Sequence, residues 1–256
     1  MSPFAEATAP SNVLTLLEGR AFSELGAFWL MRPWLSTTPR GDGHPVLILP
    51  GLLADDSSTK PLRHFLNSHG YRAHGWKLGP NRGLRDHVEH DMRARIDELF
   101  ARYGRKVSLV GWSLGGLYAR QLAKLHPDKI RCVITLGSPF AGAPTSTNAW
   151  QAYEWASGSS VDTPSLLTQG LAEAPPVPTT SIFSRTDGVC AWQACLNEEG
   201  AEVENIEVSG SHCGLGHHPA AVYAVADRLV QPEGAWTKFD RTTGWRPLVF
   251  PAVQPR

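Results

Sequence analysis

Apolar runs and amphipathic stretches alternate along most of the chain. Short apolar runs are typical of strands that are buried on both faces of a parallel sheet. They predict strands at residues 46–49, 71–78, 106–110, 129–136, 179–184 and 202–208. Apolar residues at helical spacing predict helices at 11–31, 61–68, 84–103, 117–125 and 219–229. The alternation indicates an α/β fold, built on a mostly parallel, doubly wound sheet.

This periodicity is lost between residues 141 and 178, where aromatic and aliphatic residues stand among Ser, Thr, Gly and Pro. A long irregular segment within a compact domain is usually functional. We therefore expect a cap or lid inserted at about 141–178, with one or two short helices over a site. A packed excursion without a ligand role is the alternative. The expected domains are an N-terminal helix and linker at 1–43, and a domain at 44–256 that holds the cap.

The first predicted helix carries Glu18, Arg20 and Glu24 among its apolar residues, so it does not have the pattern of a membrane span. We expect it to dock on the domain. A surface that makes peripheral contact with lipid, or contact with a protein partner, is the alternative.

Composition narrows the function classes. Lys and Arg number 24 and Asp and Glu also number 24, so the net charge is +0 and gives no support for nucleic-acid binding. No stretch has the length and apolarity of a membrane span. The first residues lack a basic segment followed by an apolar one, which predicts no signal peptide and a cytoplasmic location. The oligomeric state is not indicated.

The four cysteines are too few for a disulfide scaffold. Cys190 and Cys195 are close in sequence, and both a local bridge and a reduced pair remain open. Histidines cluster at 210–218 without the carboxylate or thiol spacing of a metal site, so we predict no bound metal.

The strongest candidate for chemistry is Gly111-Trp112-Ser113-Leu114-Gly115-Gly116, which stands between a predicted strand and a predicted helix. This is the context of a nucleophile elbow, in which Ser113 sits on a sharp turn. The strained turn needs neighbours nearly without side chains two positions away, and glycines stand there. A Gly-rich turn that only lets a helix pack closely on a sheet is the alternative.

A serine hydroxyl needs a base, and the base needs a group that orients it. His212 lies in the loop after the last predicted strand, and Asp187 lies in the loop after the strand before it. In a parallel sheet, the loops beyond the carboxyl ends of strands form the site. We therefore predict a Ser113, His212 and Asp187 triad, with His217 and Asp162 among the weaker rivals.

Two backbone amides are candidates for the oxyanion hole. Leu114 follows the serine at the start of a helix, and Leu52 lies in the loop after the first predicted strand. Apolar side chains near the elbow and in the cap are candidates to bind a substrate. They are Trp112, Phe140, Trp150, Trp155 and Leu167.

Five segments carry a resemblance to α/β-hydrolases of the bacterial lipase and esterase type. They are Val46–Leu53, Gly111–Gly116, Leu136–Ala143, Thr186–Val189 and Ser211–Gly214. Many lipases carry His-Gly before the oxyanion residue, whereas Pro50-Gly51 stands here. The resemblance implies an α/β-hydrolase fold and hydrolysis of carboxylic esters through an acyl-serine intermediate, without a cofactor.

We therefore expect a carboxylesterase or lipase-like hydrolase that acts on small-molecule esters with short- to medium-chain acyl groups. Acyl transfer to another acceptor, or amide or lactone hydrolysis by the same triad, is the first alternative. A non-catalytic binding protein of the same fold is an alternative of another class.

Overall fold

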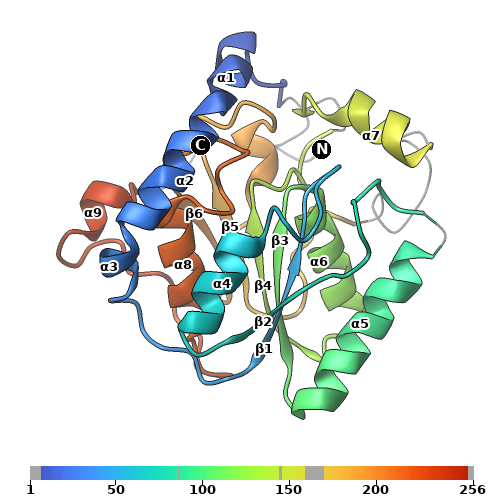
Figure 1. The fold of residues 1–256 in the computed structure, drawn as a ribbon, viewed down its shortest axis with the longest axis vertical. Helices are drawn as coiled ribbons and strands as arrows, with labels where there is room; N and C mark the ends of the chain where they lie inside the picture. The colour runs from blue at the N-terminus through green and yellow to red at the C-terminus, as the bar shows by residue number, and fades with distance from the viewer. Residues whose placement is uncertain (1–6, 86, 144–145, 159–169, 253–256) are drawn as a thin grey trace.

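The computed structural model describes residues 7–85, 87–143, 146–158 and 170–252 (Figure 1). A sheet of six strands forms its centre, in the order β2-β1-β3-β4-β5-β6. All neighbouring strands pair in parallel, which confirms the predicted doubly wound sheet. The strands are β1 (Pro45–Leu49), β2 (Arg72–Gly75), β3 (Val107–Trp112), β4 (Ile130–Leu136), β5 (Thr179–Phe183) and β6 (Val203–Glu207).

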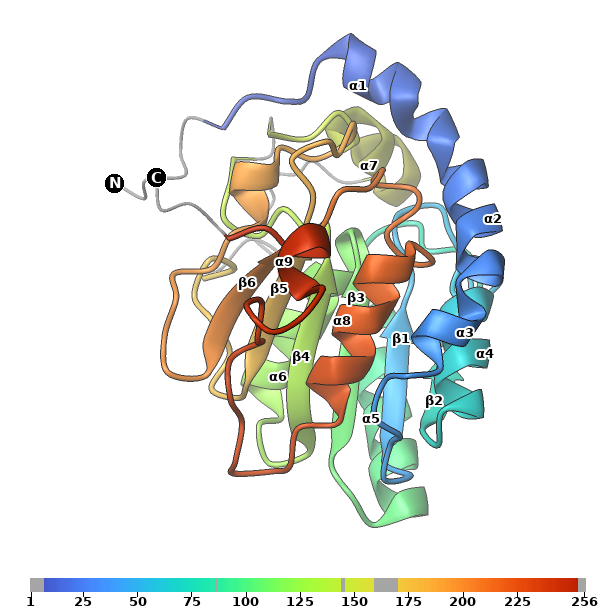
Figure 2. The same cartoon turned by 90° about the vertical axis from the view of Figure 1, so that its left-hand side faces the viewer.

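Helices cover both faces of the sheet (Figures 1 and 2). One face packs against α4 (Lys60–Ser68) and α8 (Pro219–Leu229), and the other packs against α5 (Val88–Tyr103) and α6 (Leu114–Leu125). Strand residues alternate between the two cores, so that Val46 and Ile48 face the first core while Leu47 and Leu49 face the second. Burial on both sides explains why the strands are apolar without interruption.

Two predicted elements differ from the observed ones in their bounds. The strand expected at 71–78 ends at Gly75, because the Asp56 carboxylate accepts the amides of Trp76 at 3.0 Å and Lys77 at 3.1 Å. The helix expected at 84–103 begins only at Val88.

The predicted N-terminal helix is divided into α1 (Asn12–Leu16), the 3₁₀ helix η1 (Leu17–Arg20) and α2 (Ala21–Leu30). It is followed by α3 (Arg32–Leu35), and Figure 2 shows these elements running along one side of the molecule. Phe28 and Leu35 are buried in the core, which confirms docking, whereas Leu16, Phe22 and Leu30 are 83–84% exposed. Contact of this face with lipid stays a prediction. No helix among the described residues has the length and apolarity needed to cross a membrane.

The C-terminal tail packs back on the domain at a place that the sequence pattern does not indicate. Phe239 and Phe250 are buried beside α8. The Phe250 ring contacts both the Phe239 ring and the Tyr223 ring. The short helix α9 (Arg246–Val249) lies on this face (Figure 2). Trp34 of α3 stacks on Tyr223 with ring centroids 4.9 Å apart, so α3 and the aromatic residues of the C-terminal tail both pack on α8.

Part of the expected cap lies among the described residues. The helix α7 (Trp150–Ser157) lies beyond the carboxyl ends of the strands (Figure 1). The segment that returns to β5 is held by the buried Arg120 guanidinium, which donates to the carbonyls of Leu171 at 3.0 Å and Glu173 at 3.0 Å. The division into domains and the cap's bounds remain predictions.

Candidate active site

Ser113 lies between the last residue of β3 and the first residue of α6. Its backbone has φ 54° and ψ −121°, a strained conformation for a residue with a side chain. A Cβ added to Gly111 would overlap the backbone of α6, and one added to Gly115 would overlap the carbonyl of Leu49. The two glycines therefore permit the close approach of strand and helix that the sharp turn requires.

Asp187 and His212 form a buried pair, 3% and 6% exposed. The Nδ1 atom of His212 lies 2.7 Å from Oδ2 of Asp187. The other carboxylate oxygen accepts the amides of Val189 at 2.8 Å and Cys190 at 2.7 Å. These bonds fix the carboxylate, so the imidazole it holds has a defined orientation.

The loop that carries His212 also contacts the serine turn. The indole N–H of Trp112 donates to the carbonyl of His212 at 3.0 Å. The amide of Ser113 donates to Leu136 at the end of β4 at 2.8 Å, and Gly137 follows at once. A Cβ added to Gly137 would lie 3.0 Å from Oδ2 of Asp187 and 3.1 Å from Nδ1 of His212. The structure thus brings the three predicted residues to the same edge of the sheet, beyond the carboxyl ends of β3, β5 and β6.

The charges of this pair set its protonation. Burial disfavours the imidazolium, but the Asp187 carboxylate, together with Cys190, outweighs burial and raises the pKa of His212 above its ordinary value. Since Nδ1 faces the carboxylate, Nε2 is the ring nitrogen left to exchange a proton with a substrate or a hydroxyl.

The loop after β1 lies directly against the serine turn. A Cβ added to Gly51 would lie 3.3 Å from Cβ of Ser113. The amide of Leu52 has no hydrogen-bond partner within the described part of the chain, and Leu114 is the first residue of α6, where amides lack intrahelical partners. Both amides are therefore available to an oxyanion, and their predicted role as its donors stays a prediction.

Asn81 braces this loop and was not singled out by the sequence pattern. Its side-chain N–H₂ group donates to the backbone carbonyl of Pro50 at 2.8 Å. Its backbone carbonyl accepts the amide of Leu53 at 2.6 Å. Leu53 has a φ of 59°, which is strained for leucine. Asn81 is fully buried and stands where the sequence indicated only a loop.

Cys190 is a second residue at the site that sequence analysis did not place there. Its thiol is buried, and its sulfur lies within 4.8 Å of the Asp187 oxygen and the His212 nitrogen. These three atoms are the one group of potential metal ligands found among the described residues. All four cysteines are free thiols, so Cys190 and Cys195 are not bridged.

The predicted substrate-binding residues lie in different surroundings. Trp112 and Phe140 are 8% and 2% exposed, and the Arg120 guanidinium lies 3.7 Å from the centre of the Phe140 ring. In α7, Trp150 is half-buried while Trp155 is 81% exposed. Leu167 lies outside the described residues. Contact of these side chains with a substrate stays a prediction.

Comparison with curated proteins finds partial relatives. The pimeloyl-(acyl-carrier protein) methyl ester esterase of Shewanella sp. (strain MR-7) is 32% identical over 119 residues, which cover 46% of this chain and 44% of that protein. Serine hydrolase BPHL of Mus musculus is 32% identical over 108 residues, which cover 38% of this chain and 37% of that protein. The chain thus spans less than half the length of the curated relatives it matches.

Solved structures share the fold at low sequence identity. Lipase B of Aspergillus fumigatus has a TM-score of 0.58 and 19% identity, with 75% of this chain and 53% of that chain covered. A pyrethroid hydrolase from Sphingobium faniae JZ-2 has a TM-score of 0.53 and 18% identity, with 74% and 98% covered. The family model of the alpha/beta hydrolase fold matches residues 47–159. This match, the sheet order described above and the solved structures together show that the chain has the α/β-hydrolase fold.

Proposed function

We propose that the protein is a serine hydrolase of the carboxylesterase type, which cleaves small esters with short- to medium-chain acyl groups. The observation that carries the proposal is the buried Asp187–His212 pair, held next to the strained turn at Ser113. The named esterase among the partial relatives supports an ester as the substrate class.

In the proposed reaction, Ser113 Oγ attacks the ester carbonyl while Nε2 of His212 accepts the hydroxyl proton. The Asp187 carboxylate stabilises the imidazolium that forms. The amides of Leu52 and Leu114 donate to the oxyanion of the tetrahedral intermediate. The intermediate collapses, the alcohol leaves with the proton from His212, and the acyl group remains on Ser113.

Hydrolysis of the acyl-serine repeats these steps with water. Nε2 of His212 accepts a proton from water as its oxygen attacks the acyl carbonyl. The second tetrahedral intermediate releases the carboxylic acid, and the proton returns to Ser113 Oγ. The cycle needs only the residues named here and water, and it consumes no cofactor.

Labelling with a fluorophosphonate probe tests the nucleophile. We expect one covalent adduct per chain at Ser113, identified by mass spectrometry of the tryptic digest, and no adduct in the Ser113→Ala variant. Folded protein that remains unlabelled would refute the serine mechanism and leave the non-catalytic binding protein as the better explanation.

A series of p-nitrophenyl esters then tests the substrate class. We expect kcat/KM to be highest for short to medium acyl chains. Product analysis with an added alcohol separates hydrolysis from acyl transfer, because a transferase would form the new ester in preference to the free acid. Activity on anilides above that on matched esters would contradict the ester proposal.

A further inference from the structure

One glutamate of the N-terminal segment binds both loops that carry the candidate Asp–His pair. Oε1 of Glu18 accepts the amides of Gly188 at 2.8 Å and His212 at 2.9 Å. Oε2 accepts the amide of Cys213 at 2.8 Å. Gly188 follows Asp187 directly in the chain, so a single carboxylate joins the acid loop to the histidine loop.

The chemistry of these contacts favours a fixed geometry. Hydrogen bonds from backbone amides to an ionised carboxylate are about twice as strong as bonds between neutral groups. Burial opposes the charge of Glu18, but the three amides and His212 outweigh it and keep the pKa of Glu18 below its ordinary value. The carboxylate is therefore ionised at neutral pH and accepts all three bonds.

Other residues of the segment hold the same two loops. The Glu18 contacts are thus part of a continuous interface and not an isolated surface bond. The further anchors join Thr15 Oγ1 to the carbonyl of Gly188 (2.8 Å), Arg20 to the carbonyl of Thr186 (2.6 Å), Glu24 to the amide of Ser211 (2.9 Å) and His217 to the carbonyl of Ala21 (3.0 Å).

Two glycines in these loops leave room for the N-terminal segment to pack against them. A Cβ added to Gly188 would overlap the carbonyl of Leu14, and a Cβ added to Gly214 would overlap the carboxylate of Glu24. The loops therefore lack side chains where the segment passes over them. This complementarity is an independent sign that the loops are built to be held from this side.

We propose that Glu18 is a positioning residue, which holds the loop of Asp187 and the loop of His212 in the relative placement that the triad needs. The inference rests on the proposed function for its kinetic consequence. Glu18 accepts hydrogen bonds from backbone amides of these loops and also interacts with the Cys213 thiol, so in the proposal it acts through the loops and not on the substrate. A shift of about 1 Å between catalytic groups can cost about a hundredfold in rate, so the loss of such a bridge is measurable.

The test compares Glu18→Gln and Glu18→Ala with the wild type. Gln can accept two of the amides through its carbonyl oxygen but turns an N–H₂ group toward the third donor. We expect kcat per fluorophosphonate-titrated site to fall about tenfold for Glu18→Gln and further for Glu18→Ala, with KM little changed. Titration of sites removes any misfolded fraction from the rate. Glu89→Gln, on the surface of α5, is the matched control and should equal the wild type.

Two further readouts separate positioning from a purely structural role. The pH at which kcat/KM reaches half its maximum should move lower in Glu18→Gln, because a negative charge near His212 has been removed. Hydrogen exchange at the amides of Gly188, His212 and Cys213 should speed up. A lower melting temperature with unchanged kcat per site and an unchanged pH profile would overturn the proposal.

Failure of the proposed function gives a different result. In that case the wild type itself shows no labelling and no turnover. The placement of the loops is then read from the pKa of His212 by NMR of its imidazole, which needs no catalysis. A His212 pKa that is the same in the wild type and in Glu18→Gln would overturn the positioning role in that case too.

Discussion

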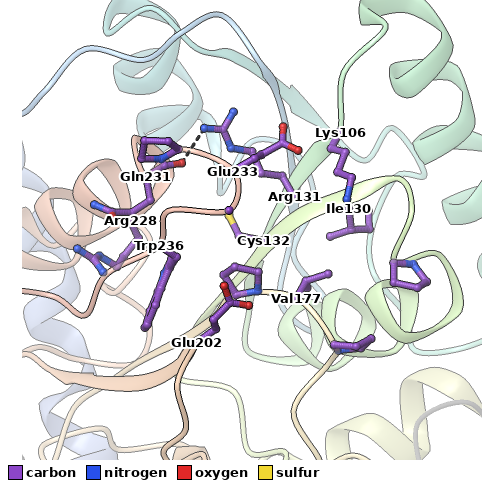
Figure 3. Close-up of a pocket in the computed structure, with 15 residues that line it drawn as sticks. Lys106, Ile130, Arg131, Cys132, Val177, Glu202, Arg228, Gln231, Glu233 and Trp236 are labelled. Carbon is purple, nitrogen blue, oxygen red and sulfur yellow. Dashed lines mark hydrogen bonds between the residues drawn. The ribbon is translucent and has the colours of Figure 1, made fainter.

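Charged residues are buried both at the amino ends of the strands and at their carboxyl ends, but their surroundings differ between these two ends of the sheet. At the amino end, Arg131 of β4 donates to Asp42 at 2.9 Å and to the carbonyl of Gln231 at 2.7 Å. Arg228 of α8 is 4% exposed and donates to the buried Glu204 of β6 at 3.0 Å. Arg131, Arg228 and Gln231 line a cavity of about 240 Å³, and Figure 3 shows both arginines at its wall, with the bond from Arg131 to Gln231.

At the carboxyl end, the buried Asp187–His212 pair is combined with strained backbone. The non-glycine residues with positive φ in the described ranges are Leu53, Lys77 and Ser113, which follow β1, β2 and β3. At the amino end, by contrast, the named arginines are compensated by carboxylates and carbonyls. Backbone strain of this kind costs on the order of 1–3 kcal/mol per residue and persists where the surroundings impose it.

The comparison teaches that buried charge alone does not identify a site in this molecule. The amino end has more ion pairs and a cavity, yet the charged groups of its pairs bind to one another. The carboxyl end adds a strained serine and an imidazole whose Nδ1 faces Asp187, so that Nε2 is not engaged by that carboxylate. Substitutions at the carboxyl end should therefore cost rate, and substitutions at the amino end should cost stability.

The largest effect is expected at Ser113. Ser113→Ala removes the attacking oxygen, and loss of the nucleophile in such triads costs roughly 10⁴- to 10⁶-fold in kcat. The urea unfolding midpoint should stay near that of the wild type, because the replacement only removes a hydroxyl. Single-turnover kinetics with a p-nitrophenyl ester measures the rate. Residual activity above a hundredth of the wild type would break the assignment of chemistry to this end.

Asp187→Asn should lower kcat/KM by roughly 10⁴-fold and also change its pH dependence. The reaction needs neutral His212, so the rate rises as pH passes the pKa of His212, which the Asp187 carboxylate raises. Removing that charge lowers this pKa, and the rising limb should move to lower pH. The measurement is kcat/KM between pH 5 and 9. A limb that stays in place would show that another group controls the protonation of the base.

Local patterns were enough to predict which loops meet at one edge of the sheet, and the roles of serine, acid and base in those loops stay predictions. Ser113, Asp187 and His212 each stand in the loop directly after an apolar strand, and a parallel sheet brings such loops to one edge. The parallel pairing of the strands and a core on each face of the sheet follow from the same alternation of apolar and amphipathic segments, whereas the order of the strands does not. For these features, neighbours in sequence carry the information that the fold uses.

The supports of the site could not be predicted in this way. Glu18 lies 170 residues from Gly188 and 194 residues from His212, and within its own helix it appears as one more polar residue on an amphipathic segment. Asn81 stands in a loop whose path depends on the end of β2 at Gly75. These contacts depend on how distant segments meet, which hydrophobic periodicity does not encode.

At the amino end, Arg228→Met should affect stability and leave the rate unchanged. It leaves Glu204 and Asp227 buried without the guanidinium, and breaking a buried pair by removing one partner costs about 3–5 kcal/mol. Urea unfolding measures the loss. The control is Lys238→Met, whose partner Glu199 is exposed, with an expected cost of up to about 1 kcal/mol. A fall in kcat per titrated site for Arg228→Met would contradict the expectation that substitutions at the amino end cost stability and not rate.

The smallest effect is expected from His44, which is buried between Asp42 and Ser108. Burial, opposed by the bond to Asp42, lowers the pKa of His44 to about 4. The folded state thus binds this proton more weakly than the unfolded state, where the pKa is about 6.5. The contribution of neutral His44 to the free energy of unfolding is present above about pH 6.5 and is lost as pH falls toward 4. The loss is about 2 kcal/mol at pH 5.

His44→Gln removes this titration, so its free energy of unfolding should fall less steeply between pH 6.5 and 5 than that of the wild type. His74, whose pKa burial also lowers to about 4, adds the same slope to both proteins and cancels in the difference. Urea unfolding of both proteins at several pH values gives the slopes. Equal slopes in His44→Gln and the wild type would show that the amino end is not the acid-sensitive part of the fold. A changed pH–rate profile in His44→Gln would instead show that the two ends are coupled through the paired strands β1 and β3. His44 precedes β1 and contacts Ser108 of β3, and Ser113 follows β3.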